Sequence, residues 1–316
     1  MTDKRRLYLL ANLALALTVV YLTWGLKQSS WRYALSLRIP KTAAILVTGS
    51  AIAFSTVVFQ TITANRILTP SIMGLDSLYL FVQTVILFFF GSQSGLHLSE
   101  NINFLLSVGA MMLFAVLLYR LLFKRESEDI YFLLLVGVIM GTMFQSLAGF
   151  LQMVMDPNEF LILQGRMFAS FNNVNTELLA FSFVIIGAVF FLSRRLYPVL
   201  DVLALGREQA LNLGVDYDKL VQRMLITVAV LVSVATGLVG PITFLGLLVA
   251  NLAREFLATY LHQYLIAASV LISIIALMGG QVLAERVFNF AAPISVIINL
   301  GGGMYFIYLL VRGNRA

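Results

Sequence analysis

Long apolar runs with almost no charged residues recur along the whole sequence. There are about ten, each close to the roughly 20 residues that a helix needs to cross the hydrocarbon core of a bilayer. They cover residues 7–26, 42–62, 72–90, 102–122, 130–154, 178–192, 224–239, 242–260, 265–283 and 294–311. In a bilayer a helix satisfies its own backbone polar groups. The pattern predicts an all-α membrane protein of about ten transmembrane helices. We expect them to form a single transmembrane domain over residues 1–316.

Charged side chains are too few to cover the surface of a water-soluble protein. They make up 11% of the 316 residues, and hydrophobic residues make up 60%, whereas a soluble domain has about 25% charged residues. A soluble enzyme is therefore excluded, and the lack of cysteine excludes a disulfide scaffold. The basic residues stand in small groups at the ends of apolar runs, which is typical of topology signals rather than of nucleic-acid binding. With both termini in the cytoplasm, most of them fall on the inner side.

The polar connection over residues 194–223 is too long for a simple turn. It is too polar to span a membrane, but it keeps a set of apolar side chains. Asp201 is expected to cap a short helix, Gly206 to break it, and Gly214 to end a second one. Two short amphipathic helices need an apolar partner, which is either a cytoplasmic protein or the lipid interface.

A break in the pattern precedes the third apolar run. Pro70 and Gly74 stand where that run should begin, and such breaks are tolerated at membrane depth only where protein shelters the backbone. Asp76 follows the break and is a candidate intramembrane polar residue, a type that usually marks function. Gly137 and Gly141, one helical turn apart in the fifth run, predict a close helix contact inside the chain rather than a dimer seam.

Signals of enzymatic chemistry are missing from the sequence. His97 and His262 lie in different loops without cysteines or clustered carboxylates, so we expect no metal site. The chain has no Gly-Lys pair and hence no phosphate-binding P-loop. A transporter is the better reading, powered either by a partner protein or by an ion gradient acting through Asp76. A membrane enzyme, or a scaffold docking an adaptor through residues 194–223, has less support.

Four stretches resemble motifs of one family, the permease subunits of ABC importers for iron–siderophore chelates, haem and vitamin B12. They stand in the family's order. They are RIPK at 38–41; NRILTP at 65–70, with Asn65, Pro70 and the later Gly74; LALG at 203–206, with Ala210, Leu213 and Gly214; and GPITFLGL at 240–247, with Gly240, Phe244, Gly246 and then Arg254. The resemblance implies the architecture of a type II ABC importer permease, in which this chain is not an enzyme.

The resemblance also implies roles for two groups of residues. The connection 194–223 becomes the loop that couples the permease to its ATPase, through Leu203, Leu205, Gly206, Ala210, Leu213 and Gly214. Arg38, Lys41 and Arg286 become cations that dock carboxylates of a substrate-binding protein. The alternative for Arg38 and Lys41 is snorkelling to the lipid interface.

The partners implied are two cytoplasmic ATP-binding cassette subunits, a second permease and a periplasmic or lipid-anchored binding protein. ATP and Mg²⁺ would be bound by the cassettes, and this chain would need no cofactor. The cargo implied is a ferric siderophore, with catecholates favoured, carried across the inner membrane along the second, fifth and eighth spans. Ala250-Asn251 and Leu261-His262-Gln263 depart from the family pattern and suggest the divergent partner of a two-permease importer.

Overall fold

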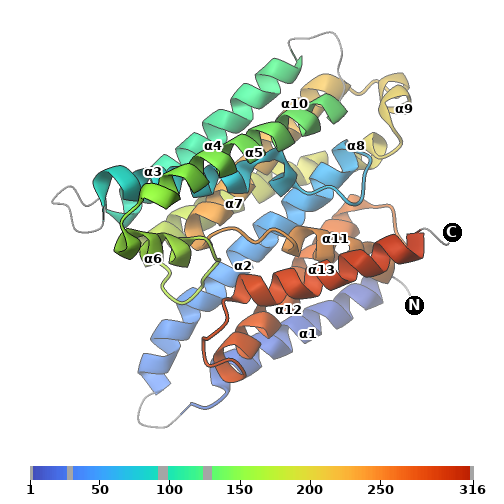
Figure 1. Ribbon diagram of the computed structural model, residues 1–316. Coiled ribbons are helices and arrows are strands. Elements are labelled where there is room, and N and C mark those ends of the chain that lie inside the picture. Colours follow the sequence, from blue (N-terminus) through green and yellow to red (C-terminus); the bar gives the residue numbers. More distant parts are fainter. Residues whose placement is uncertain (1–2, 27–30, 92–98, 124–129, 314–316) are drawn as a thin grey trace.

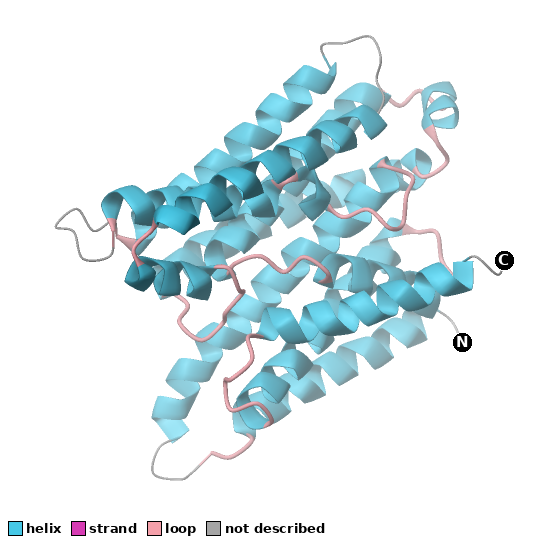
Figure 2. Cartoon of the chain, viewed as in Figure 1, coloured by secondary structure: helices cyan, strands magenta, loops and turns pink. Residues whose placement is uncertain are grey.

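The computed structural model describes residues 3–26, 31–91, 99–123 and 130–313, and this part of the chain is built of helices, without a β-strand (Figures 1 and 2). The longer helices are α1 (Asp3–Thr23), α2 (Trp31–Ile62), α3 (Leu75–Phe90), α4 (Glu100–Phe123), α5 (Ile130–Val154), α7 (Thr176–Ser193), α10 (Tyr217–Val239), α11 (Leu245–Phe256), α12 (His262–Arg286) and α13 (Ile294–Gly313). The shorter ones are η1 (Pro70–Met73), α6 (Pro157–Arg166), η2 (Arg194–Leu196), α8 (Tyr197–Leu203) and α9 (Arg207–Asn212). The predicted all-α fold is confirmed.

Each predicted span contains a helix, but the helices differ in length. Within the described residues, seven are long and apolar enough to cross a bilayer, namely α1, α2, α4, α5, α10, α12 and the stretch from α7 through α8. The third, eighth and tenth predicted spans contain α3, α11 and α13, whose apolar parts are shorter. Two of these short helices directly follow an irregular segment of the chain. Residues 65–74, which we call the first break, precede α3, and residues 240–244, which we call the second break, precede α11.

The start of the second span was predicted wrongly. We expected a loop up to Lys41, but α2 begins at Trp31 and runs through Pro40 for 32 residues. A proline inside a helix removes one backbone hydrogen bond. Ending the helix at Pro40 would instead leave several backbone polar groups unpaired near the membrane. Each unpaired group there costs more free energy than the single hydrogen bond lost at the proline. Arg38 and Lys41 therefore project from a helix instead of lying in a loop.

α2 forms the centre of the molecule. Its span is the most deeply buried of the seven, and it runs between a group containing α10 and α7 and a group containing α11 and α12 (Figure 1). α1 packs on α12 at the edge of the second group, and only 11% of its apolar span is buried. α3, α4, α5 and α6 complete the first group. The buried apolar side chains of α2, α10 and α12 belong to one continuous cluster.

Three glycines bring the first break against α5. A Cβ atom at Gly137 would stand 2.8 Å from the Met73 Cα atom, and one at Gly74 would stand 2.8 Å from the Gly141 Cα atom. No side chain fits there. The predicted use of Gly137 and Gly141 for close packing inside the chain is confirmed, and the partner is the irregular backbone that precedes α3.

Both ends of the chain lie at one end of the molecule. The start of α1 and the end of α13 are on the same side as α8 and α9, and the end of α1 and the start of α2 are on the other (Figure 1). We call these two regions the α8–α9 end and the opposite end. The arrangement agrees with an even number of crossings between the two termini.

Candidate coupling and docking sites

Two short helices fill the long polar connection between α7 and α10, as predicted. α8 ends at Leu203, and α9 runs from Arg207 to Asn212. Gly206 joins them with φ of +98°, in a region of backbone space that is strained for other residues. Gly214 follows α9 with φ of +80°. These two glycines set the angular path of the segment from α8 through α9.

The apolar side chains of this segment divide into a buried set and an exposed set. Leu203 and Ala210 are buried against the rest of the chain, so they hold the two helices in place and cannot offer a surface to a partner. Leu205, Leu211 and Leu213 are exposed at 58%, 47% and 62%. Large apolar side chains that gather on one exposed segment indicate an interaction site. The docking role predicted for the leucines can therefore belong only to the exposed set.

A histidine links α8 to two long helices. The Asp201 Oδ1 atom accepts a hydrogen bond from the His262 backbone N–H at 2.7 Å and lies 2.6 Å from the His262 Nδ1 atom. The His262 Nε2 atom lies 2.8 Å from the Thr61 Oγ1 atom of α2. The expectation that Asp201 caps its own short helix is wrong, because it lies inside α8 and instead satisfies the first backbone N–H of α12.

Little in the sequence singles out His262. A lone histidine 61 residues away from its acidic partner has no local pattern, and it stands where the chain departs from the family motif. Only the fold brings Asp201, His262 and Thr61 together. We call this set of three residues the histidine link. His97, the other histidine, lies outside the described residues.

Beside the histidine link, a cavity of about 880 Å³ opens at the α8–α9 end. It lies between the end of α2, the α8–α9 turn and the connection from α11 to α12. Gln60 organises one wall: its Nε2 atom donates to the Arg66 carbonyl oxygen at 2.6 Å, and its Oε1 atom accepts from the Arg254 Nη1 atom at 2.6 Å. Asn251 donates to the same Arg66 carbonyl at 3.0 Å. The guanidinium of Arg254 is therefore fixed in position.

The two breaks in the helices meet at Asp76. Asn65 begins the first break, where its side chain accepts the Ile67 N–H at 2.9 Å, and Pro70 begins η1. Asp76 lies in the first turn of α3 and is buried. Its carboxyl group lies in one small cavity with Ser71 of the first break and Thr243 of the second, and its buried Oδ2 atom has no hydrogen-bond partner in the described structure. A polar residue at this point joins two irregular segments that would otherwise lack a connection.

The second break contains the motif residues that follow α10. Gly240 ends α10 with φ of +98°, and Phe244 precedes the first residue of α11. A Cβ atom at Gly246 would overlap the Thr56 Oγ1 atom of α2, so α11 packs directly against α2 at this point. Arg254 lies in the last turn of α11. The motif thus positions α11 on the central helix and directs Arg254 to the cavity.

The cations predicted to dock a binding protein gather at the opposite end, but they already have partners. The Arg38 Nη1 atom donates to the carbonyl oxygens of Tyr21, Leu22 and Trp24 at 2.9–3.0 Å. Arg286 donates to the Trp24 carbonyl at 3.0 Å. Both arginines therefore satisfy the free carbonyls at the end of α1.

Lys41, the third of these cations, is part of a half-buried polar cluster. Its Nζ atom is 3.4 Å from the Glu285 Oε1 atom and 3.1 Å from the Asn172 Oδ1 atom. The Tyr21 hydroxyl and the Gln281 amide donate to the same Glu285 oxygen at 2.8 Å and 2.7 Å. The cluster ties α1, α2 and α12 together.

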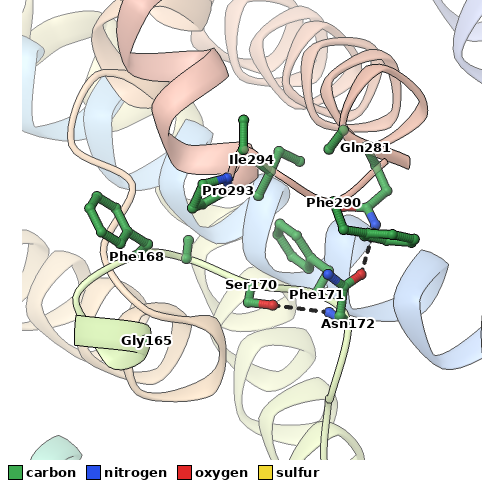
Figure 3. A pocket seen from close by; sticks show the side chains of 12 residues that line it. Gly165, Phe168, Ser170, Phe171, Asn172, Gln281, Phe290, Pro293 and Ile294 are labelled. Atoms are coloured by element: carbon green, nitrogen blue, oxygen red, sulfur yellow. Dashed lines mark hydrogen bonds between the residues drawn. The ribbon is translucent and has the colours of Figure 1, made fainter. Parts of the chain in front are cut away.

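A smaller cavity of about 200 Å³ adjoins this cluster (Figure 3). Phe168, Ser170 and Asn172 line it from the connection between α6 and α7, and Gln281 and Phe290 line it from α12 and the segment after it. Figure 3 shows the Asn172 and Gln281 amides joined by the hydrogen bond of 3.2 Å. The cavity therefore presents both amides and aromatic rings.

The architecture matches that of a solved transporter. A structure described as an inward-facing conformation of a metal-chelate type ABC transporter superposes with a TM-score of 0.83 and 26% identity, covering 98% of this chain and 99% of that one. Together with the paired breaks and the two short helices between α7 and α10, this similarity defines the class: the chain is a membrane-spanning permease of the ABC importer type.

The particular family follows from the sequence comparisons. The chain belongs to the FecCD transport family, whose model matches residues 8–312. It is 56% identical to the petrobactin import system permease protein YclO of Bacillus subtilis, over all of both chains. It is 36% identical to the petrobactin import system permease protein FatC of Bacillus anthracis, over 87% of this chain and 78% of that one. These relatives favour the ABC permease over the ion-gradient transporter.

Proposed function

We propose that this chain is the permease subunit of an ABC importer that carries a ferric siderophore, with petrobactin as the first candidate cargo. The observation that carries the proposal is the 56% identity to a petrobactin import permease over the full length of both chains. The FatC permease, also named for petrobactin, supports the same cargo at 36% identity. The permease would lie in the plasma membrane, with its α8–α9 end facing the cytoplasm.

The energy would come from two cytoplasmic ATP-binding cassette subunits. These partners would bind ATP and Mg²⁺, and this chain would contribute no catalytic residue and need no cofactor. Closure of the cassettes would move α8 and α9, and the histidine link would pass that movement to α2 and α12. Nucleotide then biases a switch between outward- and inward-facing states. The buried anchors Leu203 and Ala210 make α8 and α9 move as part of the bundle.

The cargo would pass between this chain and a second permease, which we expect to be a different paralogue. We expect the pathway to follow the second, fifth and eighth predicted spans. The fifth of these, α5, has an exposed face that could line it. Thr142, Gln145 and Ser146 of α5 are exposed on a mainly apolar helix. They lie on one side of the helix, because residues three and four apart share a face. Polar groups on a membrane helix are expected to line a pathway rather than to face lipid.

A binding protein would deliver the siderophore at the opposite end. Arg38, Lys41 and Arg286 remain the candidate docking cations, supported by their grouping there. Replacing both Arg38 and Lys41 by glutamate should weaken docking of the binding protein, and the loss should shrink as salt rises. If the variant binds the binding protein at low salt as tightly as wild type does, Arg38 and Lys41 do not dock it, and their role is limited to the contacts inside this chain.

Purification of the tagged chain in mild detergent from iron-starved cells tests the assembly. Mass spectrometry should identify an ATP-binding cassette subunit and a second, different permease. Recovery of the cassette with this permease alone would keep the importer and make it a homodimer. Recovery without any cassette, under conditions that preserve a control importer, would contradict the proposal.

A further inference from the structure

The cavity at the α8–α9 end has an unbalanced set of charges. Arg66, Arg207 and Arg254 line it, and no aspartate or glutamate is among the described residues that do. Arg207 is 3.7 Å from Asp218 across a half-exposed surface. Within the described part of the chain, neither Arg66 nor Arg254 lies within ion-pair distance of a carboxylate. Two guanidinium groups therefore face the cavity without a counter-charge.

Neutral partners hold the Arg254 side chain and the Arg66 main chain. Gln60 holds the Arg254 guanidinium at 2.6 Å through its side-chain oxygen and holds the main chain of Arg66 through its nitrogen. Arg254 is half-buried, and a half-buried cation is more stable with a hydrogen-bonded anion than with an amide. A guanidinium fork that is held in place binds a carboxylate with little loss of side-chain freedom.

Apolar side chains surround the cationic wall. Leu205 and Tyr260 line the same cavity and are 58% and 80% exposed. Arginine and aromatic residues are enriched at protein interfaces, and an apolar rim that excludes water strengthens charge pairs. A lipid headgroup would meet the arginines but would leave this rim uncovered on the side away from the bilayer.

We propose that the cavity receives a carboxylate-bearing segment of the ATP-binding cassette subunit, whose aspartate or glutamate pairs with Arg66 and Arg254. This contact adjoins the exposed leucines of the α8–α9 segment, because Leu205 also lines the cavity, and it adds an anchor for the cassette at the end of α2 and at α11. It rests on the proposed function, because it needs a cassette partner.

The test measures how tightly purified cassette binds the detergent-solubilised permease pair, at low and at high salt. Arg66→Glu and Arg254→Gln should each weaken binding about tenfold or more at low salt, and the difference from wild type should shrink at high salt. Arg5→Glu is the matched control, since Arg5 is an exposed cation of α1 outside the cavity and outside the α8–α9 segment, and it should change binding less than threefold. The Arg66 side chain makes no hydrogen bond in the described structure, so Arg66→Glu keeps the test valid if Arg254→Gln fails to fold.

A carbodiimide reaction then identifies the partner group. Arg66→Lys keeps the charge and supplies an amine, which carbodiimide joins to a carboxylate in contact with it. A permease–cassette product whose linked peptide contains an aspartate or glutamate is expected. Wild-type affinity in both arginine variants, or coupling to an anionic lipid instead of the cassette, would overturn the inference and leave the importer intact. If no cassette binds the wild-type permease, the proposed function itself is wrong.

Discussion

Single side chains at the α8–α9 end connect helices that lie far apart in the sequence. Asp201 accepts two hydrogen bonds from His262, and that histidine also contacts Thr61. One imidazole thus joins a short surface helix to two long helices. A movement of α8 cannot leave α2 and α12 unaffected while these contacts hold.

Removal of the acceptor in the histidine link should loosen α8 from α12. Asp201→Ala leaves the backbone N–H and the Nδ1 atom of His262 without a partner, which costs about 1–3 kcal/mol of unfolding free energy. We expect lower thermal stability and more ATP hydrolysed per iron imported. Asp201→Asn, which keeps the acceptor oxygen, should restore both, and Lys4→Ala at the exposed start of α1 should change neither. Normal coupling in Asp201→Ala would refute a role for the link in transmission.

Gly206 permits a turn that other residues resist. Its φ is +98°, where a β-branched residue costs about 1–3 kcal/mol. Gly206→Val should leave the protein folded and inserted, but it should displace α9 and separate ATP hydrolysis from uptake. Gly187→Val is the control, because a Cβ atom at Gly187 meets nothing within 4 Å. Transport at the wild-type rate by Gly206→Val would show that the segment does not couple.

At the scale of elements, the sequence predicted where helices occur but not how their ends are held. Apolar runs near 20 residues are a strong signal, and the two breaks and two short helices were marked by glycine and proline. The start of α2 at Trp31 was missed, because Pro40 is a local stop signal and the forces that keep the helix continuous come from the bilayer. The histidine link was missed, because contacts across 61 residues depend on the whole fold.

The contact between α5 and the first break should be sensitive to size. A Cβ atom at Gly137 would stand 2.8 Å from Met73, so Gly137→Val forces two elements apart and should cost about 1–3 kcal/mol by overpacking. Gly149→Val, on the same helix with nothing within 4 Å, should be close to neutral. Thermal unfolding in detergent measures the difference. Equal stability of the two variants would contradict the packing described for α5.

The end of α1 should depend on Arg38. Three carbonyls of the last turn share its guanidinium, and α1 is otherwise the least buried span. Arg38→Ala should therefore speed backbone hydrogen exchange in residues 21–24 and leave α12 protected. Arg32→Ala serves as the control, because Arg32 contacts only the Trp31 ring in the described structure. Unchanged exchange in Arg38→Ala would mean that packing on α12 alone holds the helix.

For the whole molecule, fold and family were predictable because membrane helices follow simple rules and the motifs keep their spacing. The cationic cavity was not predictable, since Arg66, Arg207 and Arg254 come from three distant segments. The structure places the two termini, α8 and α9 and this cavity at one end, and the arginines that bind the carbonyls at the end of α1 at the other (Figure 1). Such a division fits a chain that meets an ATPase on one side and a cargo-delivering protein on the other.

ATP-driven uptake tests the central claim most directly. The complete importer, reconstituted in proteoliposomes with its binding protein loaded with radioactive ferric petrobactin, should accumulate iron only when ATP is supplied on the cassette side. An imposed proton or sodium gradient without ATP should give no uptake, and Asp76→Asn should not abolish the ATP-driven process if it folds. Uptake driven by an ion gradient and independent of ATP would contradict the account.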